Sequence, residues 1–103
     1  MALVAQDSER ITFDSTAGGI GFTAAKLTTK VLMATVRLEQ AQVRIRVASG
    51  VTLTAGGAEG SPKIEVGETF EVWGSDDLKN FRGIRTGTIS GLGQVIYYGQ
   101  GGG

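Results

Sequence analysis

Residues 31–47 read VLMATVRLEQAQVRIRV, and this stretch decides the fold class. Its first half alternates more apolar side chains with more polar ones such as Arg37 and Glu39, as expected for a strand that buries one face. One long helix over residues 24–47 is excluded, because the apolar positions keep a period of two and β-branched residues are frequent. The stretch therefore predicts two successive strands, over residues 31–39 and 43–47.

The alternation changes phase between these two strands. The first strand directs its even-numbered apolar residues inward, whereas the second directs Val43, Ile45 and Val47 inward. A shift of one residue exchanges the two faces of a strand. A tight turn or a β-bulge is therefore expected between Glu39 and Gln42.

Further segments with the same alternation follow along the chain, separated by clusters of glycine. The additional predicted strands cover residues 10–13, 51–54, 63–66, 69–73 and 94–98. The segments 63–66 and 69–73 predict a hairpin across Gly67 and Glu68. The hairpin's core candidates are Ile64, Val66, Phe70 and Val72.

Two smaller features are predicted near the helical turn. Residues 75–80 are typical of one helical turn, with Ser75 able to cap its first amides. Further along, Phe81 and Ile84 share a face only if Gly83 kinks or bulges the strand that carries them.

Short strands at intervals of about 8–12 residues are typical of antiparallel sandwiches and barrels. We therefore predict an all-β fold, a single antiparallel β-sandwich of the jelly-roll or immunoglobulin-like type with at most one short helical turn. The sandwich domain is expected over residues 1–98, with an extended arm over residues 1–9. Residues 99–103 are expected to form a flexible glycine-rich tail.

The composition of the 103 residues excludes several classes of chemistry. The chain has no His and no Cys, so Ser-His-Asp triads, Cys-His pairs and the usual zinc sites are excluded. Ten basic and ten acidic side chains give a formal net charge of zero, which provides no global field for nucleic acid or an anionic membrane. The first residues lack the layout of a secretory signal, and the apolar stretches are too short to span a bilayer. We expect neither nucleic acid nor membrane as a partner.

Three clusters of residues in the sequence are candidates for a phosphate-binding loop, a Ca²⁺-binding loop and a catalytic carboxylate pair, and none of them has the pattern that such a site requires. The glycines around Ile20 lack the strand–loop–helix context of a phosphate loop. Asp76, Asp77 and Asn80 lack the spacing of a Ca²⁺ loop. Glu65, Glu68 and Glu71 do not predict a cleft that would drive two carboxyl pKa values apart. We therefore predict no catalytic, metal or cofactor-binding residue, and a protein that is not an enzyme.

Arginines and one tryptophan are the candidate contact residues. If the strands over 31–39 and 43–47 adjoin, their arginines line one exposed face, although a solvated face with Arg–Glu pairs is the common alternative. Trp73 is expected to point away from the main core, unless it folds back as a lid at the strand end. The candidate partner-binding residues are Arg37, Arg44, Arg46, Trp73, Arg82 and Arg85.

The last strand is apolar on both faces, with Tyr97 and Tyr98 on opposite sides. Such a strand is expected to be central in its sheet, or to have one face covered by another chain.

The order of segments in the second half of the chain resembles a known family. The resemblance is carried by Val43–Val47 with its following glycine turn, by Ile64–Val72, by Leu78–Gly87, and by the closing strand that ends in Tyr97 and Tyr98. In this pattern the chain resembles small virion structural proteins of tailed bacteriophages. It departs from them after the arginine-containing strand, where residues 51–57 replace the Pro-Thr step that such proteins often carry.

The resemblance implies a non-catalytic structural protein that binds and stabilises the capsid shell as a head decoration, or cement, protein. The implied partners are the major capsid protein or other virion proteins, together with further copies of the chain in a homo-oligomer. The implied location is the virion, assembled in the cytoplasm of the host bacterium. The alternatives are a tail or head–tail component, or a carbohydrate- or receptor-binding module that stacks Trp73 on a sugar.

Overall fold

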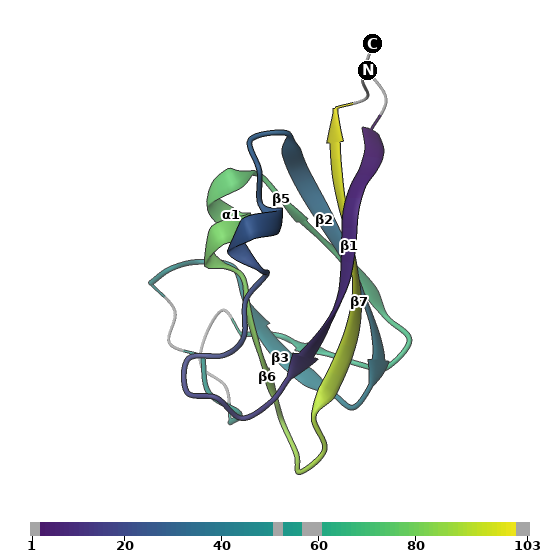
Figure 1. Ribbon diagram of the computed structural model, residues 1–103. Helices are drawn as coiled ribbons and strands as arrows, with labels where there is room; N and C mark the ends of the chain where they lie inside the picture. Colours follow the sequence, from purple (N-terminus) through teal and green to yellow (C-terminus); the bar gives the residue numbers. More distant parts are fainter. Residues whose placement is uncertain (1–2, 51–52, 57–60, 101–103) are drawn as a thin grey trace.

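The computed structural model, which describes residues 3–50, 53–56 and 61–100, contains two antiparallel β-sheets (Figure 1). The four-stranded sheet has the spatial order β1 (Leu3–Phe13), β7 (Gly91–Gln100), β2 (Val31–Gln40) and β5 (Thr69–Trp73). The three-stranded sheet has the order β4 (Lys63–Ile64), β3 (Val43–Arg46) and β6 (Arg82–Arg85). A 3-10 turn, η1 (Ala24–Lys26), and a short helix, α1 (Ser75–Asn80), accompany the sheets. The predicted all-β fold with two antiparallel sheets is confirmed.

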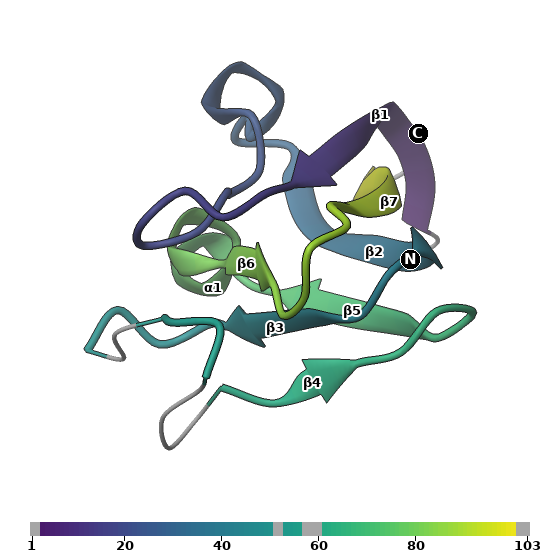
Figure 2. The ribbon, with the colours of Figure 1, turned by 90° about the horizontal axis from the view of Figure 1, so that it is seen from below.

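The phase change after Glu39 marks the point where the chain leaves one sheet and enters the other. β2 ends at Gln40 in the four-stranded sheet, and β3 begins at Val43 in the three-stranded sheet. The pairing of β2 with β7 shifts register between Leu38 and Gln40, and Ala41 has a φ of 58°. The predicted bulge or turn is confirmed, and its consequence is that β2 and β3 do not adjoin. Figure 2 shows β1 and β4 at opposite sides of the molecule.

The predicted hairpin between residues 63–66 and 69–73 is wrong, because these segments belong to different sheets. Ile64 pairs with Val43 in one sheet, whereas β5 pairs with β2 in the other. The connecting residues are held by Leu38, whose amide donates to the Glu68 carbonyl at 3.0 Å. Gly67, with a φ of 91°, donates its own amide to the Leu38 carbonyl at 2.7 Å. The segment between β4 and β5 passes from one sheet to the other. Val66, which lies on this segment, is 54% exposed and is therefore not the core residue that was predicted.

The core lies between the sheets and is centred on aromatic rings. Phe22 stacks on Phe81 with 4.4 Å between ring centroids, and it meets Tyr97 edge-on at 5.5 Å. Phe13 meets Phe81 edge-on at 6.1 Å. Leu78 of α1 also joins this core. The described hydrophobic core also includes Ile11, Val31, Ala34, Val36, Leu38, Val43, Ile45, Val72 and Val95.

Gly83 has a different role from the one expected. The register of β3 with β6 is continuous through the Ile45–Gly83 pair, so the strand is not bulged there. Gly83 faces the core, where a Cβ atom would lie 2.7 Å from Cδ1 of Phe13. The bulge that would let Phe81 and Ile84 share a face is therefore absent from β6. Gly83 is needed because the Phe13 ring packs directly on its backbone.

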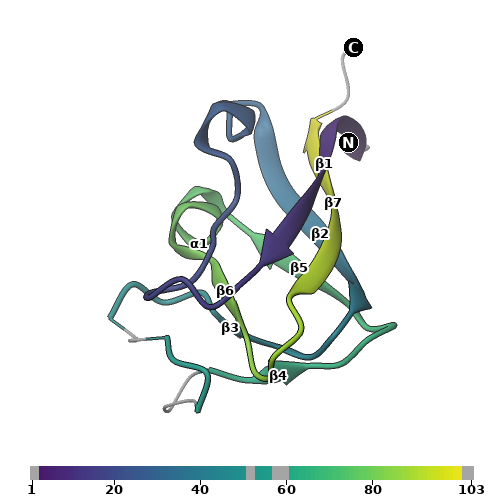
Figure 3. The same cartoon turned by 60° about the horizontal axis from the view of Figure 1, so that its bottom comes forward.

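The first and last strands pair with each other along their length, so the two ends of the described chain lie together (Figure 3). Residues 3–9 belong to β1, so the expected N-terminal arm is wrong over this range. Gly99 and Gln100 likewise belong to β7 and are not part of a free tail. Residues 1–2 and 101–103 of those two predictions lie outside the described residues. β7 lies between β1 and β2, which confirms that the strand apolar on both faces is central.

Two local predictions also need correction. α1 begins at Ser75, its N-cap residue is Gly74, and no side chain caps the helix, so Ser75 is not its cap. In the segment predicted as a strand over 51–54, residues 51–52 lie outside the described residues, and Leu53 and Thr54 are not in a strand. Leu53 is buried all the same.

Candidate functional site

The outer face of the four-stranded sheet, the side turned away from the core, presents side chains in rows that run across the strands. Paired residues stand side by side, and alternate residues of each strand share this face. The aromatic row is Ala5, Tyr98, Met33 and Trp73. The middle row is Ser8, Ile96, Thr35 and Glu71. The arginine row is Arg10, Gln94, Arg37 and Thr69.

The aromatic row borders a shallow hollow of about 270 Å³. Met33 is the buried member of the row, and it lies between Tyr98 and Trp73, which stand on the neighbouring strands. Trp73 is 52% exposed, so the prediction that it points away from the core is confirmed. The residues that line the hollow are Leu3, Met33, Thr35, Glu71, Trp73 and Tyr98.

A hydrogen bond holds the exposed indole in place. Nε1 of Trp73 donates to Oε1 of Glu71 at 3.0 Å. Glu71 lies two residues earlier on the same strand, so both side chains emerge from the same face of β5. A large aromatic side chain that is already ordered loses little conformational freedom when a partner covers it.

Charges on this face form no ion pair with the described residues of the chain. Among the described residues the ion pair found within 4 Å joins Lys26 to Asp7, which lie elsewhere. Glu71 therefore has no cation beside it, and neither Arg10 nor Arg37 has a carboxylate beside it. Both arginines are exposed. Within these three rows the outer face thus carries one acid next to aromatic rings and two bases in a separate row, and the exposed Glu39 follows Arg37 two residues further along β2.

The predicted arginine face is wrong in its composition, because Arg37 lies in one sheet and Arg44 and Arg46 lie in the other. Arg44 reaches along the segment that follows β3 and donates to the carbonyls of Ala55 at 3.1 Å and Ser61 at 2.8 Å. Arg46 donates to the carbonyl of Ser49 at 3.2 Å. These contacts give both side chains a structural role in holding loop backbone.

Arg82 and Arg85 hold backbone in the same way. Nη1 of Arg82 donates to the carbonyls of Lys79 at 2.9 Å and Phe81 at 2.6 Å. Nη1 of Arg85 donates to the carbonyl of Thr88 at 3.2 Å, within the connection to β7. Partner binding by these arginines stays a prediction, whereas Arg37 and Trp73 are the two candidates that share the outer face.

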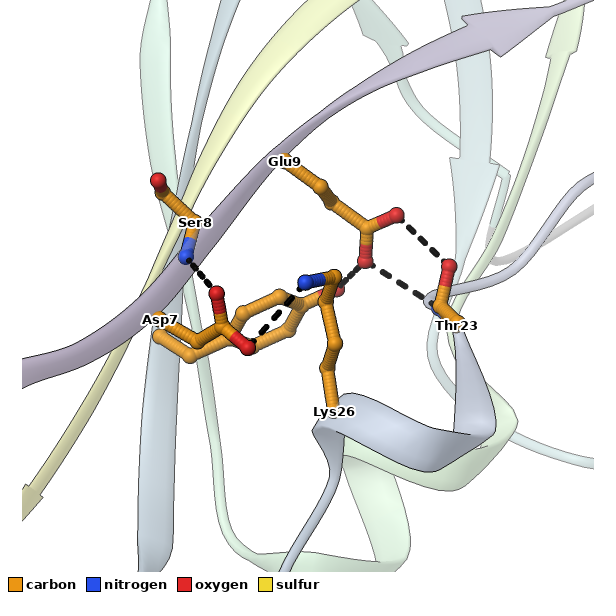
Figure 4. Close-up of polar contacts among 6 residues, drawn as sticks. Asp7, Ser8, Glu9, Thr23 and Lys26 are labelled. Atoms are coloured by element: carbon orange, nitrogen blue, oxygen red, sulfur yellow. Dashed lines mark hydrogen bonds and ion pairs between the residues drawn. The ribbon is translucent and has the colours of Figure 1, made fainter.

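A polar cluster that the sequence analysis missed joins β1 to the segment carrying η1 (Figure 4). The Glu9 carboxylate accepts hydrogen bonds from the Tyr97 hydroxyl, from the Thr23 hydroxyl at 2.6 Å and from the Thr23 amide at 3.3 Å. Next to it, Nζ of Lys26 lies 3.1 Å from Oδ2 of Asp7. The sequence does contain an indication of this cluster. Asp7 and Glu9 alternate in phase with Ile11 and Phe13 along β1, so they lie on the side of the strand that faces the core.

The electrostatics of the cluster match a structural role. Burial raises the pKa of the Tyr97 hydroxyl, and the hydrogen bond to Glu9 raises it further, so this hydroxyl remains a donor at neutral pH. The hydrogen bond from the Ser8 amide lowers the pKa of Asp7, and Lys26 lowers it as well. A hollow of about 380 Å³ lies beside the cluster, lined by residues that include Gln6, Asp7, Lys26 and Lys30.

The described part of the chain offers neither a metal-binding cluster nor a membrane-spanning helix. In residues 3–50, 53–56 and 61–100 there is no group of three or more acidic side chains placed to hold a metal ion. Over the same residues no helix is long and apolar enough to cross a membrane. Comparison of the chain with protein-family models, with curated proteins and with solved structures finds no match.

Proposed function

We propose that this chain is a non-catalytic structural protein of a bacteriophage virion, which stabilises the capsid shell as a decoration protein through protein–protein contacts. The observation that carries the proposal is the exposed Trp73, fixed by Glu71 beside a hollow on a regular sheet face. Tryptophan, tyrosine and arginine are the residue types that contribute most to binding energy in protein interfaces. The outer face combines all three on four hydrogen-bonded strands.

The location in a virion is supported by the resemblance of the segments from Val43 to Tyr98 to tailed-phage virion proteins. The implied partners are the major capsid protein or other virion proteins, met during assembly in the host bacterial cytoplasm. A tail or head–tail position is the alternative within the same class. All of these positions require a surface that binds protein, which the outer face supplies.

The test compares phage particles that carry variants of this chain. Particles from the phage or prophage that encodes the chain are purified on a density gradient, and the chain is quantified in the particle band by mass spectrometry. We expect a fixed number of copies per particle for the unaltered chain, and at least tenfold fewer for Trp73→Ala. Ile89→Ala is the matched control, because Ile89 is an exposed apolar side chain on the connection between β6 and β7, away from the outer face.

Two results would contradict the proposal. The chain could be absent from particles, or Trp73→Ala could be incorporated as well as Ile89→Ala. Trp73 is exposed, so its removal leaves the core intact, and a melting temperature equal to that of the control establishes that the variant is folded.

A second candidate function is favoured by one specific observation. An exposed indole that stands beside a carboxylate and the Thr35 hydroxyl offers a stacking surface and hydrogen-bonding groups for a sugar ring. Binding on a glycan array that disappears in Trp73→Ala and persists in Ile89→Ala would favour this carbohydrate-binding function.

A further inference from the structure

The outer face is complementary to itself. Its aromatic row contains a hollow beside the unpaired Glu71 carboxylate, and its arginine row, on the other side of the middle row, presents two unpaired guanidinium groups. A guanidinium group is attracted to the face of Trp or Tyr as well as to a carboxylate. The hollow therefore fits an arginine side chain, and the same face supplies one.

We propose that the outer face binds a second copy of this chain, face to face, about a two-fold axis that runs along the middle row. This proposal rests on the proposed function in one respect, namely that the outer face is a protein interface. Two-fold dimers use the same patch on both copies, so each contact occurs twice. Net charge of zero on the chain means that two copies do not repel each other as whole molecules.

The axis determines which residues meet. A two-fold rotation about the middle row exchanges the aromatic row with the arginine row and keeps each strand opposite its own copy. Glu71 therefore also stands opposite Glu71 of the second copy, and the Arg37 side chains of the two copies lie diagonally on either side of this acidic pair and offset its repulsion. Met33 and Arg37 both belong to β2, so Arg37 of the second copy stands over Met33, between Trp73 and Tyr98. Glu71 is the diagonal neighbour of Met33 on β5, within reach of a long side chain. Arg37 of each copy thereby occupies the hollow of the other.

The packing is geometrically ordinary. Two sheets pack face to face at about 10 Å with strand directions within about 30° of each other. The strands β1, β7, β2 and β5 are 11, 10, 10 and 5 residues long. At about 3.4 Å per residue and about 4.8 Å between strands, they give the face a flat area of about 600 Å². The dimer would bury about 1,200 Å² in total, the lower limit for stable interfaces. We therefore expect dissociation in the micromolar range.

Two other occupants fit the face less well. Nucleic acid would bring phosphate groups toward Glu71, which has no cation to neutralise it. A glycan stacked on Trp73 would leave Arg10 and Arg37 without partners. A second copy pairs both the acid and one of the bases.

The dimer is tested by measuring the mass of the full chain by sedimentation, first for the unaltered chain and then for variants in which the charge at residue 37 or residue 71 is reversed. We expect a mass of twice 10.7 kDa at about 300 μM, well above a micromolar dissociation constant, and dissociation on dilution. Glu71→Arg and Arg37→Glu should each weaken the dimer at least tenfold. An equimolar mixture of the two variants should restore it, because residue 71 of one chain then meets residue 37 of the other with opposite charge in both contacts. Lys63→Glu, a charge reversal on the other sheet, is the control and should leave the dimer unchanged.

Several outcomes would overturn the dimer. The unaltered chain could stay a monomer at about 300 μM, or the mixture of variants could stay monomeric while each remains folded by circular dichroism. Binding of a glycan or an oligonucleotide by a monomer, lost in Trp73→Ala, would assign the face to that ligand. The particle assay separates the two proposals: a chain that is monomeric yet present in particles refutes only the dimer, and a dimer absent from particles refutes only the virion function.

Discussion

Replacing Gly83 by alanine should destabilise the protein, because the added methyl group would enter space that Phe13 occupies. The new Cβ would lie 2.7 Å and 2.8 Å from two ring carbons of Phe13 and 3.1 Å from Cγ1 of Val43. Phe13 is 1% exposed and meets Phe81 on another side, so its ring has no free space to move into. The backbone of Gly83 cannot retreat either, since its amide and carbonyl bond to Ile20 at 2.9 Å and 2.8 Å.

The magnitude follows from two opposing effects. Inserting a methyl group into a filled core costs about 1–3 kcal/mol. Alanine reduces the conformational entropy of the unfolded chain and returns about 0.4–1 kcal/mol. The net loss in the free energy of unfolding is therefore about 1–2 kcal/mol, which corresponds to a melting temperature about 5–15 °C lower for a domain of this size.

Urea unfolding followed by Trp73 fluorescence measures this loss. Gly87→Ala is the matched control, because a Cβ atom at Gly87 meets no atom within 4 Å, and it should leave stability unchanged or slightly raised. Phe13→Leu should make room for the methyl group, so the double variant should be about 1–2 kcal/mol more stable than the sum of the single changes predicts. Additive effects, or a Gly83→Ala protein as stable as the control, would refute the packing argument.

Three further predictions concern the polar groups. Glu9→Gln should lower the free energy of unfolding by about 1–2 kcal/mol in urea titrations, because a single amide oxygen replaces a carboxylate that accepts three hydrogen bonds; an unchanged midpoint would contradict it. The raised pKa of Tyr97 means that the folded state keeps a proton that the unfolded state releases above about pH 10, so stability should fall as pH rises beyond that value and fall less in Tyr97→Phe; equal losses in the two proteins would argue against this assignment. Arg44→Met should speed digestion of the segment after β3 by a protease of broad specificity several-fold, since the carbonyls of Ala55 and Ser61 lose their donor, while Lys63→Met should not.

Alternation along a strand is a local property, and it identified many of the buried side chains, such as Val36, Val43 and Val72, although Leu32, Val47 and Val66 were expected inside and are exposed. β2, β3 and β5 were predicted nearly at their observed bounds, and parity alone placed Trp73 outside the core. Alternation does not specify the neighbouring strand, and β3 pairs with β4 and β6 instead of with β2. The predicted grouping of Arg37 with Arg44 failed for this reason, because the bulge near Ala41 passes the chain from one sheet to the other.

Contacts between residues that lie far apart in the sequence could not be predicted from local sequence patterns. Glu9 meets Thr23 across 14 residues and Tyr97 across 88, so no nearby pattern indicates that its carboxylate is satisfied. The role of Gly83 could not be predicted for the same reason. The sequence suggested that this glycine kinks or bulges its strand, whereas a larger residue is excluded there by the Phe13 ring, which lies on another strand. The rows of the outer face became visible only when four strand registers were combined.

The position of β7 between β1 and β2 determines when this protein folds as it is synthesised. The strand at the centre of the larger sheet, β7, is built from Gly91–Gln100, and both of its neighbours, β1 and β2, leave the ribosome much earlier than it does. Until β7 arrives, β1 has no partner strand and Phe13 and Phe22 lack the Tyr97 side of their core. A sheet completed by pairing distant segments also closes slowly. The larger sheet therefore stays incomplete until β7 has been synthesised, and a product that stops before β7 exposes two unpaired strand edges to aggregation and proteolysis.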